Sequence, residues 1–147
     1  MRYLFFLLYI FVVLAQAKEY KAVFDCSSKD MNFVASRMIL IERTLDMIEN
    51  NSDTAKFAIT VHGGCAPIVS KNYDELVNDE DLEYVKRSQE QLLKLMKRDV
   101  EVTVCAISLN ANTIPKEDVI SSVNISQNSF IDTIGYQNAG YALMIFN

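Results

Sequence analysis

Three cysteines and one histidine are the residues of this 147-residue chain best suited to chemistry. The cysteines are Cys26, Cys65 and Cys105, and His62 stands just ahead of Cys65. A cysteine attacks or carries sulfur only as the thiolate, whereas two cysteines can also pair in a disulfide. The odd count leaves at least one sulfur without an intramolecular partner. No Ser-His-Asp order and no second histidine support a hydrolase.

The segment His62-Gly63-Gly64-Cys65 allows several interpretations. His62 is either a base or hydrogen-bond donor beside a pocket, or a turn histidine whose ring caps backbone groups. Gly63 and Gly64 favour a tight turn over a phosphate site, because the rest of a nucleotide fingerprint is missing. The three cysteines with His62 contain no C-x₂-C pair, so we expect neither a metal nor a cofactor.

The first residues are typical of an export signal. Met1 and Arg2 open the chain, an unbroken apolar run covers residues 3–14, and Ala15-Gln16-Ala17 has the form of a signal-peptidase site. The run is shorter than the roughly 20 residues that span a bilayer. We therefore expect a cleaved signal over residues 1–17, with an uncleaved membrane anchor as the alternative. An exported chain would keep its cysteines where disulfides persist.

The composition indicates one globular domain over residues 18–147. Half of the residues are hydrophobic, 22% are charged and the net charge is −5. Such a balance excludes a disordered chain, and the negative charge argues against a nucleic-acid partner. After removal of the signal we expect no membrane association.

Strands and helices are predicted to alternate along this domain. Helical periodicity marks residues 31–50, 79–98 and 126–138, the last with Phe130, Ile131 and Ile134 facing inward. The predicted strands cover residues 20–25, 57–61, 100–107, 119–125 and 141–146. This alternation predicts an α/β fold with a parallel sheet and helices on both faces. The cysteines then gather at the carboxyl edge of the sheet, where such folds bind ligands.

Several segments together resemble the DsrE/DsrF-like family across residues 21–146. They are Val61-His62-Gly63, the run from Cys105 to Leu109, Ile114 with Glu117-Asp118, and the closing stretch from Gln137 to Ala142. The export signal places the chain with an exported, single-domain branch of that family.

The resemblance implies a flavodoxin-like sheet of about five strands, with the strand order 2-1-3-4-5. It also implies a homo-oligomer, a trimer or hexamer, in a bacterial periplasm. Cys105 matches the family's sulfur-carrying cysteine, which implies a persulfide carrier that meets a sulfur donor or acceptor protein. Polar residues that follow Cys105, Asn110 among them, are candidates for binding together with His62, Gly63, Cys65 and Cys26.

The implied strand order also bears on the disulfide. Neighbouring strands lie about 4.8 Å apart, and in the order 2-1-3-4-5 the strand of Cys26 adjoins both other cysteine-bearing strands. We therefore expect any intramolecular disulfide to use Cys26, with Cys65 favoured over Cys105 as its partner, which leaves Cys105 free. The alternative to a sulfur carrier is a non-catalytic binding or interaction module with structural cysteines, in which Cys105 is a buried core residue.

Overall fold

A computed structural model describes residues 17–146. The predicted signal lies outside the described residues, apart from Ala17. Within the described range, no helix is long and apolar enough to cross a membrane.

The predicted strands and helices occur in the predicted order, together with one additional short helix and three 3₁₀ turns. The strands are β1 (Glu19–Cys26), β2 (Thr54–Val61), β3 (Glu101–Cys105), β4 (Asn124–Ser126) and β5 (Ala142–Phe146). The helices are α1 (Met31–Asn50), α2 (Asp79–Met96), α3 (Ala106–Ala111) and α4 (Ser129–Asn138). The 3₁₀ turns are η1 (Gly63–Val69), η2 (Tyr73–Glu75) and η3 (Lys116–Asp118).

The five strands form one parallel sheet, so the predicted fold class is confirmed. The observed order is β4-β3-β2-β1-β5, and the expected order 2-1-3-4-5 is wrong. Strands β1 to β4 lie side by side in the order in which they occur in the chain. The last strand, β5, pairs with the other side of β1. As a result β2 separates the strand of Cys26 from the strand of Cys105.

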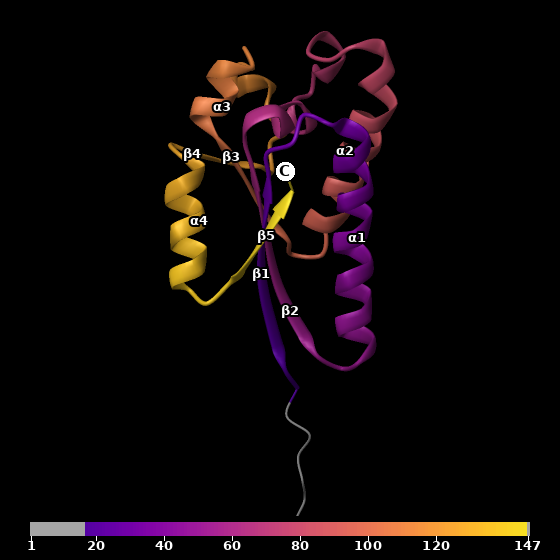
Figure 1. Ribbon diagram of the computed structural model, residues 1–147, viewed down its shortest axis with the longest axis vertical. Helices are drawn as coiled ribbons and strands as arrows, with labels where there is room; N and C mark the ends of the chain where they lie inside the picture. The colour runs from indigo at the N-terminus through magenta and orange to yellow at the C-terminus, as the bar shows by residue number, and fades with distance from the viewer. Residues whose placement is uncertain (1–16, 147) are drawn as a thin grey trace, which may run out of the picture.

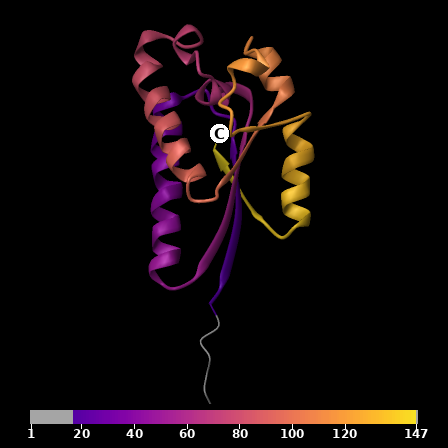
Figure 2. The same cartoon turned by 180° about the vertical axis from the view of Figure 1, so that it is seen from behind.

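The direction of winding explains how the helices are divided between the two faces. Crossovers between parallel strands are right-handed, so connections that advance in opposite directions place their helices on opposite faces. Helix α1 connects β1 to β2 and α2 connects β2 to β3; these two connections run in the same direction across the sheet, and both helices cover one face. Helix α4 precedes β5, on the connection that runs back across the sheet from β4, and covers the other face (Figures 1 and 2).

The two faces of the sheet differ in polarity. Strand register places Cys26, Val61 and Val104 side by side, on the face that packs against α1 and α2 in the main hydrophobic core. One residue earlier in each strand, Asp25, Thr60 and Thr103 are aligned on the face beneath α4. The sheet therefore has an apolar face and a partly polar face.

Helix α4 is oriented opposite to our expectation. Its apolar residues Phe130, Ile131 and Ile134 are 70%, 63% and 58% exposed, so the prediction that they face inward is wrong. The sheet face beneath α4 carries polar side chains, and the helix turns the side chains of Asp132 and Tyr136 toward polar partners instead. Helical periodicity identified the apolar stripe correctly but not the side that it faces.

Boundaries near Cys105 also differ from the prediction. The third strand ends at Cys105 rather than continuing to residue 107, because α3 begins at Ala106 with Cys105 as its N-cap. The fourth strand is only Asn124–Ser126. These differences place Cys105 at the junction of a strand and a helix.

Candidate thiol site

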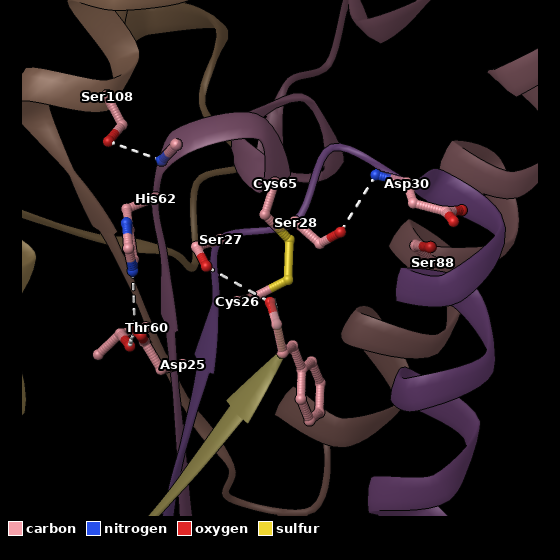
Figure 3. Close-up of a disulfide and its surroundings, with 12 residues drawn as sticks. Asp25, Cys26, Ser27, Ser28, Asp30, Thr60, His62, Cys65, Ser88 and Ser108 are labelled. Carbon is pink, nitrogen blue, oxygen red and sulfur yellow. Dashed lines mark hydrogen bonds and ion pairs between the residues drawn. A yellow bond between two sulfur atoms is a disulfide. The ribbon is translucent and has the colours of Figure 1, made fainter.

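The three cysteines lie at the carboxyl edge of the sheet but not at a common site. Cys26 is the last residue of β1, Cys105 is the last residue of β3, and Cys65 lies in η1 just after β2. A disulfide joins Cys26 to Cys65, with the Cα atoms 5.8 Å apart, which is the pairing that we expected. Figure 3 shows this disulfide on the side of the sheet that faces α1.

Cys105 is free and lies on the opposite face from the disulfide. Its partner in register, Ser126, and its neighbour Val104 fix its position at the end of β3. Because side chains alternate along a strand, Cys105 points away from the face that Val104 and Cys26 share. Cys26 and Cys65, both fully buried in their disulfide, are therefore not part of the site around Cys105.

Several hydrogen-bond donors surround the sulfur of Cys105. Burial raises the pKa of this thiol, since the side chain is only 3% exposed. The nearby backbone N–H groups of Ser108, Ser129 and Ile107, together with the Ser108 hydroxyl, lower it and outweigh the burial. The pKa of Cys105 is therefore lowered, and the surroundings favour the thiolate.

Helix α3 and turn η1 are connected by polar contacts beside this sulfur. The Gly63 backbone N–H donates to Ser108 Oγ at 2.9 Å. The Asn112 amide donates to the carbonyl oxygens of Gly63 at 2.9 Å and Ser108 at 2.8 Å. Because Ser108 Oγ accepts from Gly63, its own proton is free to point at Cys105.

His62, Asp25 and Thr60 form a second polar group on the same face. His62 Nε2 lies 2.7 Å from Asp25 Oδ1, and the Thr60 hydroxyl donates to the same oxygen at 2.9 Å (Figure 3). The hydrogen bond with Asp25 raises the pKa of His62, against the opposing effect of burial. Burial raises the pKa of Asp25, but the hydrogen bonds with His62 and Thr60 bring it below its usual value.

Of the residues predicted for binding, the structure brings His62 and Gly63 to the edge where Cys105 lies. Asn110 is exposed on α3, and among the described residues its side chain makes no hydrogen bond; the neighbouring Asn112 makes the contacts instead. Among residues 17–146, no group of three or more His, Cys, Asp or Glu side chains could hold a metal ion.

Sequence reasoning missed Asp25, Thr60 and Ser129. Ser129 follows Cys105 by 24 positions and reaches it only through the packing of α4. Asp25 did carry a local signal: it directly precedes Cys26 at the end of a predicted strand, and alternation places it on the opposite face. Its partner His62 could not be identified without the register between β1 and β2.

The fold and the site together define a class of protein, a parallel α/β domain with a free, buried cysteine at the carboxyl edge of its sheet. The chain belongs to the DsrE/DsrF-like family, whose sequence profile matches residues 21–146. This match confirms the resemblance drawn from the motifs.

Two known proteins are similar to this chain. An uncharacterized protein of Aquifex aeolicus is 32% identical over 144 residues; the match covers 97% of this chain and 63% of the relative's own length. A solved structure of a protein of unknown function from Methanobacterium thermoautotrophicum superimposes with a TM-score of 0.68 at 12% identity. That match covers 86% of this chain and 99% of the other, and it shows a common fold.

Proposed function

We propose that this protein is a sulfur carrier that holds sulfane sulfur as a persulfide on Cys105. The observation that carries the proposal is the set of N–H and O–H donors around the Cys105 sulfur, which lowers the pKa of the thiol although the side chain is buried. Membership of the DsrE/DsrF-like family supports a role of the sulfur-relay type.

Loading and unloading are two exchange steps of the same form. In loading, the Cys105 thiolate attacks the terminal sulfur of a donor persulfide; the donor S–S bond breaks as the new one forms, and the donor leaves as a thiolate. The terminal sulfur keeps its proton. In unloading, an acceptor thiolate attacks that terminal sulfur, and Cys105 leaves as a thiolate. A lowered pKa makes Cys105 a better leaving group and so favours delivery.

The test is to treat the native, non-reduced protein with glutathione persulfide and to measure the intact mass. We expect a gain of one sulfur atom in the wild type and no gain in Cys105→Ser, which retains the Cys26–Cys65 disulfide as an internal control. Reduction of the loaded protein should remove the added sulfur. Equal uptake by Cys105→Ser, or uptake only after unfolding, would refute the proposal.

The burial of Cys105 favours a second candidate, a non-catalytic binding or interaction module in which this cysteine is structural. At 3% exposure the sulfur has little direct access to a partner. The two candidates differ in native reactivity: a structural cysteine reacts with alkylating reagents only once the protein unfolds, whereas a carrier thiolate reacts in the folded protein near neutral pH.

The proposal extends to export and to self-association. We place the mature chain, residues 18–147, in a bacterial periplasm, where it meets a sulfur donor or acceptor protein. A mature N-terminus at Lys18 in exported protein would support this placement, and one still at Met1 would refute it. Self-association is supported by the exposed apolar residues Phe130, Ile131 and Ile134 on α4.

A further inference from the structure

His62 is aligned with Cys105 across neighbouring strands. The register of β2 and β3 pairs Thr60 with Thr103 and ends with Val61 paired with Val104, and extrapolating it by one residue places His62 opposite Cys105. The backbone of His62 is extended, with φ −153° and ψ −179°, and its N–H donates to the Cys26 carbonyl at 2.9 Å. The extended backbone of His62 therefore carries the line of β2 one residue past its end at Val61, and the extrapolated register places His62 beside Cys105 on the neighbouring strand.

Both side chains lie on the same face of the sheet. Alternation places His62 on the face of Thr60, and its hydrogen bond to Asp25 requires this orientation. Cys105 is on the face of Thr103, which is the face of Thr60 by register. The negative charge of an ionised Cys105 accordingly contributes to raising the pKa of His62.

The remaining charged groups on this face have partners of their own. From β1 and β2, Lys21 and Lys56 both pair with Glu19, at 3.2 and 2.8 Å. From β3, Glu101 accepts from the Asn124 amide of β4 at 3.3 Å, and burial together with Glu101 raises the pKa of Tyr136 on α4. From α4, Asp132 accepts from Ser126. Neither α3 nor η1 contains a charged residue. Within the described residues, His62 is therefore the basic side chain aligned with Cys105.

We propose that Asp25 and Thr60 act as positioning residues that hold His62 as an imidazolium beside Cys105, where it stabilises the thiolate that forms whenever the sulfane sulfur leaves. This inference rests on the proposed carrier function and assigns a role to the hydrogen-bonded chain Thr60–Asp25–His62. Thr60 occupies one lone pair of Asp25 Oδ1 and fixes the carboxylate, and Asp25 fixes the ring through Nε2. The other ring nitrogen, Nδ1, is not used by Asp25 and is available to interact with the Cys105 sulfur.

The first test is a titration of the Cys105 thiolate by its ultraviolet absorbance in the non-reduced protein, with Cys105→Ser as the blank for the tyrosines. We expect the apparent pKa of Cys105 to rise by roughly one unit in His62→Gln, because an opposite charge is lost from the sulfur. Asp25→Asn should raise it in the same direction. Thr60→Val should raise it less, and Thr60→Ser, which restores the hydroxyl, should return it to the wild-type value.

The second test uses the fact that the chain has one histidine, whose ring proton gives a single NMR signal. Coupling between two sites is reciprocal, so Cys105→Ser must lower the pKa of His62 by the same amount that His62→Gln raises the pKa of Cys105. A histidine with a purely structural role would not show this equality. Unchanged titration of each group in the other's variant would overturn the inference.

The proposed function and this inference can fail separately. If the two groups are coupled but glutathione persulfide adds no sulfur to Cys105, the carrier function fails and the charge pairing stands. If Cys105 loads normally while its pKa is the same in His62→Gln, the inference fails and the carrier function stands. Should Asp25→Asn prove unfolded by circular dichroism, the His62 titration in Cys105→Ser decides, because that variant leaves Asp25 and Thr60 in place.

Discussion

At the scale of single residues, the contrast between Cys26 and Cys105 shows how position in a strand sets the chemistry of a thiol. Each is the last residue of its strand, yet their side chains point to opposite faces of the sheet. Cys26 lies among apolar residues and forms a disulfide. Cys105 lies beneath polar groups, where hydrogen-bond donors stabilise a thiolate. The difference follows from strand register, since the residue type is the same.

The Asp25–His62 pair should make stability depend on pH. The raised pKa of His62 contributes stability that is full below the ordinary value of 6.5 and is lost as pH rises through the folded pKa. The lowered pKa of Asp25 contributes stability that is present above the ordinary value of 3.8 and is lost as pH falls through the folded pKa. The pair is therefore most stabilising between these two ordinary values.

Urea unfolding of wild type and His62→Gln across this range measures the effect. We expect the wild type to be more stable by roughly 1–2 kcal/mol within the window, as for a charge-assisted hydrogen bond. The difference should shrink on both sides of the window. A difference that is constant with pH would contradict the assignment of an ion pair.

At the scale of elements, turn η1 is held in place by close contact with the segment that follows β1. The Gly64 N–H donates to the Ser27 carbonyl at 3.1 Å. A Cβ on Gly64 would lie 2.5 Å from Lys29 Cβ and 2.7 Å from Lys29 Cα. The turn that presents His62 therefore tolerates no side chain at this position.

Gly64→Ala should destabilise the protein by about 1–3 kcal/mol, because the added methyl group meets backbone atoms that cannot move away freely. Gly135→Ala is the matched control: it lies inside α4, and no described heavy atom comes within 4 Å of its added Cβ. This control should gain about 0.5–1 kcal/mol from the lower backbone entropy of alanine. Chemical denaturation of both variants measures the effects, and a neutral Gly64→Ala would show that the close contact relaxes.

The Cys26–Cys65 disulfide should contribute a large part of the stability of this edge. It joins β1 to η1 across a sequence separation of 39 residues. Replacing both cysteines with alanine should lower the free energy of unfolding by roughly 3–4 kcal/mol, through the added freedom of the unfolded chain. Cys105→Ala, under the same conditions, serves as the single-cysteine control. Equal stability of the wild type with and without reductant would argue against a disulfide in the folded protein.

At the scale of the whole molecule, α4 presents an exposed apolar face. Phe130, Ile131 and Ile134 are each more than half exposed, whereas the opposite face of α4 meets polar groups of the sheet. A cluster of this kind on a folded protein marks an interaction surface. It supports the proposed trimer or hexamer.

Light scattering of the mature chain at micromolar concentration should give a multiple of the monomer mass. Ile134→Glu, which places a charge within the apolar face of α4, should shift the mass to the monomer. Met47→Glu is the control, because Met47 is 67% exposed but lies on α1, on the other side of the sheet. A monomer mass for the wild type at every concentration would refute self-association.

The sequence alone determined those features that depend on neighbouring residues. The predicted helix over residues 31–50 has the observed bounds, because its apolar stripe and its N-cap are local: Asp30 Oδ1 accepts from the Phe33 N–H at 3.0 Å. The alternation of strands and helices also predicted the parallel sheet and the carboxyl-edge position of the cysteines. The motifs around His62 and Cys105 identified the family.

The tertiary structure decided what depends on contacts between distant segments. The order of the strands followed from β5 returning to β1, and the direction in which α4 faces followed from the polarity of the sheet beneath it. The partnership of Asp25 with His62, 37 residues apart, follows from the register of two strands. Local periodicity specifies which residues share a face, but only the pairing of strands specifies which faces meet.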